Sequence, residues 1–205
     1  MTLPRLLLVT DRRQMQPTFE AALEAALRGG ARLIQLREKE LAPREVLALA
    51  IQAQRLCGKH GAKLLVNSRA DIARAAHADG VHLPENDLPP AAARLSLSSH
   101  ALCGASVHSV EAAREAVAQG ADYLVFGPVF STSSHPDSPP TGLGQLRAVA
   151  STASRPVFAI GGVDGTSAHR CLQAGAYGVG VISAVWRADD IGAAVRSLLA
   201  TVENS

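Results

Sequence analysis

Short apolar runs alternate with alanine-rich stretches of helical periodicity along the chain, and this alternation constrains the fold more than any other feature. The runs are apolar on both sides, which is typical of strands in a parallel sheet that is covered on both faces. They predict β-strands at Leu6–Val9, Arg32–Leu36, Lys63–Val66, Gly80–Leu83, Leu102–Ala105, Tyr123–Phe126, Val157–Ile160 and Gly178–Ile182. The stretches between them predict helices at Phe19–Leu27, Pro43–His60, Ala70–Ala76, Leu88–Leu97, Val110–Gln119, Leu143–Ala153, Ser167–Gln173 and Asp189–Val202.

The number of strand–helix units favours one architecture. Eight units in 205 residues match a small barrel of alternating strands and helices. We therefore predict an α/β fold, a compact single-domain (β/α)8 TIM barrel that spans residues 1–205. An open, doubly wound sheet is the main alternative. It would need a glycine-rich loop after an early strand, whereas the first predicted strand is followed by Thr10-Asp11-Arg12-Arg13.

Composition and charge exclude several classes of function. Aromatic residues make up only 3% of the chain, which predicts an aliphatic core and argues against modules that stack nucleic-acid bases on aromatic side chains. The net charge of +2 comes without a Lys/Arg run, so no nucleic-acid partner is expected. The N-terminal apolar run is too short for a secretion signal or a membrane span, so we expect a cytoplasmic protein that does not enter a membrane. The three cysteines match no zinc-site spacing and are expected to be reduced thiols.

Polar residues at the ends of the predicted strands are the site candidates, because catalytic groups of such barrels lie at the carboxyl ends of the strands. Strand two runs into Gln35-Leu36-Arg37-Glu38-Lys39, and strand alternation puts Gln35, Arg37 and Lys39 on the same side. An amide and two cations that converge at a barrel mouth suit a polyanionic ligand such as a diphosphate. Asn67 follows strand three and lies at the same rim.

Two carboxylates follow strand four. Asp87, together with Glu85, is a candidate ligand for a hard cation such as Mg²⁺, which uses few protein carboxylates and completes its coordination with water and substrate phosphates. The alternative role of Asp87 is the N-cap of a helix that starts at Leu88. Both interpretations stay open at this point.

A phosphate site is predicted at the last two strands. Gly161 and Gly162 follow strand seven, where the missing side chains let backbone N–H groups approach a phosphate. Ser183 follows strand eight, whose loop forms the second half of the phosphate site that recurs in these barrels. The long loop Ser131–Gly142 contains His135 and is either a surface connection or an active-site lid.

Several longer motifs carry a family resemblance, and they are specific together although none is specific alone. They are Gln35-Leu36-Arg37-Glu38-Lys39, Ala78-Asp79-Gly80-Val81-His82-Leu83, Gly127-Pro128-Val129-Phe130, Ala159-Ile160-Gly161-Gly162-Val163 and Val181-Ile182-Ser183-Ala184. With them the chain resembles the thiamine phosphate synthase/TenI family over essentially its whole length. The family fold is a (β/α)8 barrel, in agreement with the strand count.

The resemblance implies a transferase of thiamine biosynthesis that joins hydroxymethylpyrimidine diphosphate to a thiazole phosphate and releases diphosphate. Its partners would be these small phosphorylated substrates, its cofactor would be Mg²⁺, and its oligomeric state stays open. Positions that match the family's site are implied to serve as follows: in catalysis Arg37, Lys39, Ser106 and His135; in substrate binding Gln35, Arg37, Lys39, Asn67, Thr132, Gly161, Gly162, Ile182 and Ser183; and in metal binding Asp87.

Two positions depart from the synthase pattern. Ser68 stands where the family has an aspartate that binds Mg²⁺, and His135 stands where it has a lysine that binds diphosphate. Both losses suit a TenI-like thiazole tautomerase, an isomerase that needs acid–base groups but no metal. However, Pro128 stands where TenI carries a histidine. The synthase is therefore the leading hypothesis, a tautomerase without cofactor is the alternative, and a non-catalytic thiazole-phosphate-binding or regulatory protein is the third.

Overall fold

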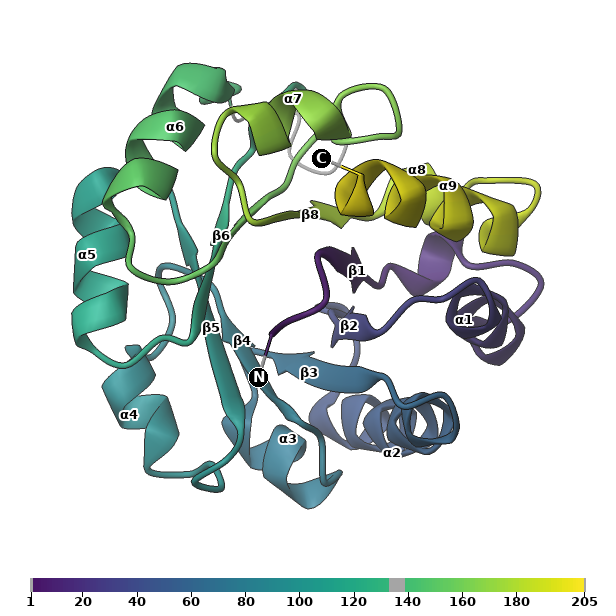
Figure 1. The fold of residues 1–205 in the computed structure, drawn as a ribbon. Helices are drawn as coiled ribbons and strands as arrows, with labels where there is room; N and C mark the ends of the chain where they lie inside the picture. The colour runs from purple at the N-terminus through teal and green to yellow at the C-terminus, as the bar shows by residue number, and fades with distance from the viewer. Residues whose placement is uncertain (1, 133–138, 205) are drawn as a thin grey trace.

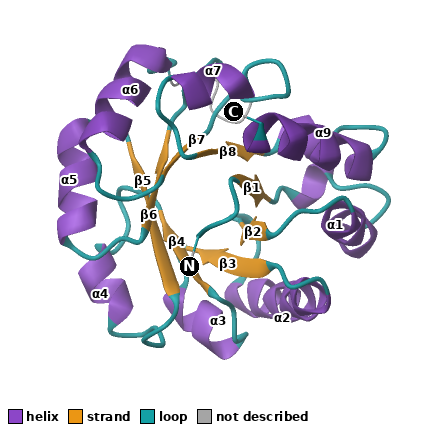
Figure 2. Ribbon diagram, viewed as in Figure 1, coloured by secondary structure: helices purple, strands orange, loops and turns teal. Residues whose placement is uncertain are grey.

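Eight parallel strands close into a barrel in a computed structural model that describes residues 2–132 and 139–204. Each strand pairs with its neighbours in sequence, and β1 pairs with β8 to complete the ring. Helices surround the strands (Figure 1, Figure 2). The strands are β1 (Leu6–Val9), β2 (Leu33–Leu36), β3 (Lys63–Asn67), β4 (Gly80–Leu83), β5 (Leu102–Val107), β6 (Tyr123–Phe126), β7 (Val157–Ala159) and β8 (Gly178–Val181). The predicted (β/α)8 TIM barrel is confirmed.

The outer ring consists of the predicted helices with small changes in their bounds. They are α1 (Phe19–Arg28), α2 (Pro43–Lys59), α3 (Ala70–Ala75), α4 (Pro90–Arg94), α5 (Val110–Ala118), α6 (Gly142–Thr152), α7 (Ala168–Gln173) and α9 (Ile191–Glu203). The prediction of a helix over Leu88–Leu97 was wrong at both ends, because Pro89 is the extended residue before the first turn and Pro90 opens the helix. Two short elements were not predicted: the 3-10 turn η1 (Arg12–Gln14) and the helix α8 (Ser183–Trp186).

Local chemistry explains where the longer helices begin. Thr18, Ser109 and Asp190 precede α1, α5 and α9, and each side-chain oxygen accepts a hydrogen bond from the backbone N–H three residues later. At α2, Pro43 occupies the first turn, and Glu45 accepts a hydrogen bond from the Ala42 N–H at 2.9 Å.

The core has two layers that follow the alternation of side chains along the strands. Inside the barrel, Leu7, Val9, Leu33, Leu65, Tyr123, Val125 and Phe158 form one cluster. Their neighbours on the same strands point outward and pack against the helices in a larger cluster. The core is mostly aliphatic, as predicted, and a few aromatic side chains contribute to it. Tyr123, Phe126, Phe158 and Trp186 are the largest fully buried side chains, two of them inside the barrel and two in the layer between strands and helices.

Two further predictions concern the cysteines and the membrane. Cys57, Cys103 and Cys171 are free and buried, and burial raises the pKa of the Cys57 thiol to about 12 and of the other two thiols to about 11. Among the described residues, no helix combines the length and the apolar character that crossing a membrane requires. The cytoplasmic location stays a prediction.

Candidate active site

A cavity of about 830 Å³ opens at the carboxyl ends of the strands. It brings together most of the residues that the sequence singled out. The predicted site residues that line it are Gln35, Arg37, Lys39, Asn67, Ser106, Thr132, Gly161, Gly162, Ile182 and Ser183. Asp87 is not among the lining residues, and His135 lies outside the residues that the structure describes.

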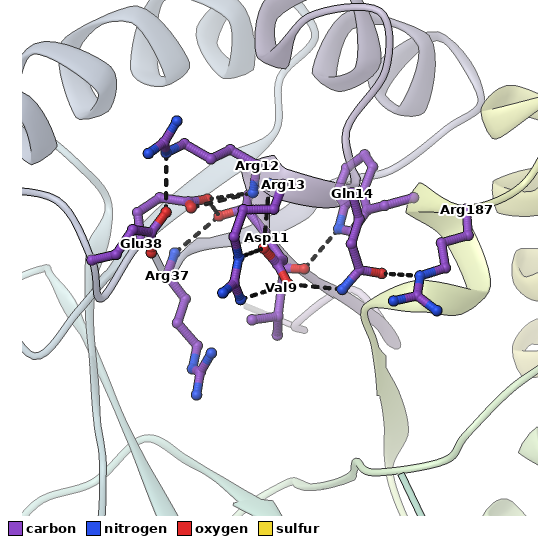
Figure 3. A network of polar contacts seen from close by, with 11 residues as sticks. Val9, Asp11, Arg12, Arg13, Gln14, Arg37, Glu38 and Arg187 are labelled. Carbon is purple, nitrogen blue, oxygen red and sulfur yellow. Dashed lines mark hydrogen bonds and ion pairs between the residues drawn. The ribbon is translucent and has the colours of Figure 1, made fainter. Parts of the chain in front are cut away.

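The two cations come from the end of β2 and the loop after it, and a buried carboxylate holds that loop. Glu38, only 6% exposed, accepts a hydrogen bond from the Thr10 hydroxyl at 2.5 Å and from the Arg12 N–H at 3.2 Å. Thr10 Oγ1 in turn accepts from the Arg37 N–H at 3.0 Å. Figure 3 shows the Arg37 side chain extending away from this network. The alternation that turns Glu38 toward the β1 loop therefore leaves Arg37 and Lys39 to face the cavity.

The electrostatics of this rim favour an anionic ligand. Burial lowers the pKa of Arg37 from its ordinary value. The positive charge of Arg37, followed by burial, lowers the pKa of Lys39. Two like charges held this near each other and partly out of water are stabilised by a bound anion, which supplies the missing counter-charge. The arrangement thus fits a ligand with several negative oxygens.

Two side-chain amides, one at β2 and one at β3, are hydrogen-bonded to each other at the cavity. The Gln35 side chain donates to Asn67 Oδ1 at 3.0 Å, and Asn67 Nδ2 donates to Ser68 Oγ at 3.0 Å. Ser68 has a left-handed φ of 65°. Ser68, the departure from the family's aspartate, therefore orients the Asn67 amide in this chain. The hydrogen bonds give each amide one defined orientation toward the cavity.

Sequence reasoning missed the polar residues that support Ser106. His82 Nε2 lies 2.9 Å from Ser106 Oγ, and His82 Nδ1 lies 3.0 Å from the Tyr123 hydroxyl. His82 is 2% exposed, and burial together with the charge of Arg37 lowers its pKa to about 3, so the imidazole is neutral. The signal was present in the sequence, since strand alternation turns His82 inward while Val81 and Leu83 face the helices.

The glycine rim after β7 has a backbone that only glycine readily adopts. Gly161 and Gly162 have φ values of 92° and 65°. A Cβ on Gly162 would lie 2.5 Å from the carbonyl oxygen of Ser131. Ile182 and Ser183 border the same cavity at the end of β8, so two glycines and a hydroxyl-bearing residue line one cavity. This is the chemistry of a phosphate site.

The carboxylates near β4 lie where the main cavity meets a smaller recess, and Glu85 lines both. Glu85 lines the main cavity, where it accepts hydrogen bonds from the His108 N–H at 3.2 Å and pairs with His108 Nδ1 at 2.5 Å. Asp87 lines a smaller adjoining recess of about 240 Å³, and its side chain accepts a hydrogen bond from the Leu88 N–H at 2.7 Å. The alternative role of Asp87 as N-cap was wrong, because Pro89 is the cap residue of α4. Among the described residues, no three His, Cys, Asp or Glu side chains are grouped to hold a metal ion.

Comparison with known proteins identifies the family of this chain. A family model described as thiamine monophosphate synthase matches residues 6–185. The chain belongs to this family. A thiamine-phosphate synthase of Chloroflexus aurantiacus is 43% identical over 200 residues, which cover 97% of this chain and 92% of that protein. A thiamine-phosphate synthase of a Roseiflexus species is 41% identical over 199 residues, 96% of this chain and 84% of that protein.

A solved member of the family shares the whole architecture. The thiamine phosphate pyrophosphorylase from Pyrococcus furiosus superposes with a TM-score of 0.90 at 38% sequence identity. The match covers 98% of this chain and 96% of that one. The family resemblance and the barrel fold predicted from the sequence are therefore both confirmed.

Proposed function

We propose that this protein is a thiamine phosphate synthase, a transferase that couples hydroxymethylpyrimidine diphosphate with thiazole phosphate to give thiamine phosphate and diphosphate. One observation carries the proposal beyond family membership. A single cavity has a pair of cations at one rim and, at another, a glycine-lined rim that we propose as the phosphate site. Two phosphorylated substrates could therefore lie side by side in it. We also propose that residues 1–205 act as one domain.

The reaction requires a site that stabilises the departing diphosphate. Breakage of the carbon–oxygen bond leaves a pyrimidine-stabilised cation and transfers the electron pair to diphosphate. Arg37 and Lys39 are positioned to hold this developing negative charge, which is where preorganised cations lower a barrier most. Gln35 and Asn67 orient the pyrimidine, while Gly161, Gly162, Ile182 and Ser183 hold the thiazole phosphate. The thiazole nitrogen then attacks the cation and completes the new bond.

Mg²⁺ is proposed as the cofactor, held by few protein ligands. Glu85 is a carboxylate that lines the cavity, and Asp87 follows two residues later in the adjoining recess. This donor set fits Mg²⁺, which commonly takes one or two carboxylates and fills its remaining positions with water and substrate phosphates. When bound, the ion would neutralise charge on the diphosphate. Asp87 remains a proposed ligand, and Glu85 is the carboxylate that offsets the aspartate replaced by Ser68.

The other two hypotheses are less well supported. The synthases of Chloroflexus and Roseiflexus match nearly the whole chain, so a thiazole tautomerase is not favoured. A non-catalytic binding protein would not need two cations at the same cavity as the proposed phosphate site.

A two-substrate assay tests the proposal. Purified protein is mixed with hydroxymethylpyrimidine diphosphate, thiazole phosphate and Mg²⁺, and thiamine phosphate is followed by chromatography. We expect product that depends on both substrates and on Mg²⁺. Arg37→Gln should lower the rate strongly, whereas Arg196→Gln on α9 should not. Absence of product above background would refute the synthase, and calorimetry with thiazole phosphate alone would then separate a binding protein from a protein without this site.

A further inference from the structure

Three polar side chains form a continuous line from the interior of the barrel to the active-site cavity. The Tyr123 hydroxyl lies 3.0 Å from His82 Nδ1, and His82 Nε2 lies 2.9 Å from Ser106 Oγ. Tyr123 is 0% exposed and His82 is 2% exposed, whereas Ser106 lines the cavity. The residues belong to three neighbouring strands, β4, β5 and β6, so the register in which these strands pair brings them together.

Two arrangements of protons satisfy both hydrogen bonds when the imidazole is neutral. In the first, Tyr123 donates to Nδ1, the Nε2–H donates to Ser106 Oγ, and the proton of Ser106 is left for the cavity. In the second, Ser106 donates to Nε2, the Nδ1–H donates to the Tyr123 oxygen, and the proton of Tyr123 is left over. Burial lowers the pKa of His82 to about 3, which excludes the doubly protonated ring near neutral pH.

Burial decides between the two arrangements. In residues 2–132 and 139–204, His82 is the only side chain in hydrogen-bond contact with the Tyr123 hydroxyl. The second arrangement would therefore leave a donor without an acceptor in the apolar interior beside Phe158. The first leaves the spare donor on Ser106, at a cavity where water or a ligand can accept it. The first arrangement is thus the more stable one.

The surrounding backbone makes room for this line of residues. A Cβ on Gly104 would lie 2.0 Å from the Tyr123 ring and 2.3 Å from its hydroxyl oxygen. Gly104 pairs in register with both His82 and Tyr123 in the neighbouring strands. The tyrosine ring therefore occupies the space that a side chain at Gly104 would take. Its hydroxyl contacts His82.

We propose that Tyr123 and His82 are positioning residues that set the direction of the Ser106 hydroxyl, so that Ser106 meets the substrate as a hydrogen-bond donor. The acceptor is an anionic or lone-pair atom of the bound substrate. This role rests on the proposed function for its kinetic consequence, but the proton arrangement itself exists in the free protein.

The proton arrangement is tested first, without substrate or activity. Two-bond ¹H–¹⁵N correlation spectra of ¹⁵N-histidine-labelled protein distinguish the two neutral tautomers of a ring. We expect His82, assigned with His82→Asn, to be in the Nε2–H tautomer from pH 6 to 8. An Nδ1–H tautomer, or a ring that becomes doubly protonated in this range, would overturn the proposal even if the enzyme proves to be a synthase.

Kinetics in the synthase assay test the coupling to Ser106. We expect Ser106→Ala to lower kcat/KM by about tenfold and Tyr123→Phe to lower it by a smaller factor, as the loss of one directed hydrogen bond would. Tyr123→Phe added to Ser106→Ala should cause no further loss. Tyr177→Phe is the matched control, because its hydroxyl donates to the Leu3 carbonyl before β1, at the amino ends of the strands. Losses that multiply in the double variant, or an inert Ser106→Ala, would disprove the proposal.

Discussion

At the scale of single residues, one buried carboxylate connects two loops at the mouth of the barrel. Glu38 links the β1 and β2 loops through Thr10 and Arg12. Burial, the largest influence, raises its pKa above the ordinary value of 4.5 although the hydrogen bond from Thr10 acts in the opposite direction. The folded protein therefore binds this proton more tightly than the unfolded chain does.

Replacement of Glu38 predicts a pH-dependent difference in stability. A raised folded-state pKa contributes stability that is fully present below about pH 4.5 and is lost as the pH rises through the raised value. The free energy of unfolding of Glu38→Gln should therefore rise relative to wild type between about pH 4 and pH 7. Urea unfolding at a series of pH values measures it. Glu40→Gln, an exposed neighbour paired with Arg12, is the control. A difference that shrinks with rising pH would contradict the assignment.

The proposed phosphate site also depends on a single glycine. Gly162 has a φ of 65°, and an added Cβ would meet the Ser131 carbonyl oxygen at 2.5 Å. Gly165 lies in the same loop and has open space around the position of a Cβ. The two glycines therefore differ in the very property that the proposed phosphate site requires.

Gly162→Ala should lower the affinity for thiazole phosphate by at least about tenfold, because the new methyl group would displace the backbone that is proposed to bind the phosphate. Gly165→Ala should bind as wild type does. Isothermal calorimetry with thiazole phosphate measures both. Equal affinities of the two variants would show that the phosphate binds elsewhere.

At the scale of elements, a helix of about one turn is fixed by a contact with a distant strand. The α8 helix has four residues and no side-chain cap, so its own hydrogen bonds do not hold it. Trp186, 2% exposed, donates from its indole Nε1 to the Val9 carbonyl at 2.7 Å. This bond ties the end of α8 to the end of β1 and thereby positions Ser183 at the cavity.

Trp186→Phe should lower the free energy of unfolding by about 2 kcal/mol, because it leaves the buried Val9 carbonyl without its partner and removes part of a packed side chain. It should also weaken thiazole phosphate binding through Ser183. Thermal unfolding and calorimetry measure the two effects. Phe19→Leu, at the half-buried start of α1, removes aromatic volume without this hydrogen bond and is the control for volume. Unchanged stability and affinity would show that α8 does not depend on the indole.

At the scale of the whole molecule, closure of the barrel depends on a close approach between its first and last strands. Leu6, Leu7 and Leu8 pair with Val179, Gly180 and Val181. Gly178 lies at the start of this seam, where an added Cβ would be 2.2 Å from the Arg5 carbonyl oxygen. By contrast, Gly58 lies within α2 and has open space around it.

Two glycine-to-alanine changes should consequently have opposite effects on stability. Gly178→Ala should lower the free energy of unfolding by more than about 2 kcal/mol, because the methyl group forces β1 and β8 apart. Gly58→Ala should raise it by about 0.5–1 kcal/mol, since alanine restricts the unfolded chain and favours the helix. Urea unfolding followed by circular dichroism measures both. Similar effects of the two changes would indicate that the β1–β8 seam tolerates separation.

Much of the candidate site could be predicted from the sequence, because the side of a strand on which a side chain lies follows from its position in the sequence. The side chains of a strand alternate, so Gln35, Arg37 and Lys39 could be placed on one side before any contact was known. Asp87 shows where this reasoning ends. It lies in a loop rather than on a strand, and its side chain turns to the neighbouring recess instead of the main cavity.

What the sequence by itself determined is the order of strands and helices, the barrel and the rim at which the polar residues gather, because periodicity and turn chemistry act over a few neighbouring residues. Only the tertiary structure decided which side chains meet. His82 lies 41 residues from Tyr123 and 24 from Ser106, and Thr10 lies 28 from Glu38. Such contacts depend on the register in which neighbouring strands pair, and burial in the closed barrel then keeps the His82 ring neutral by lowering its pKa.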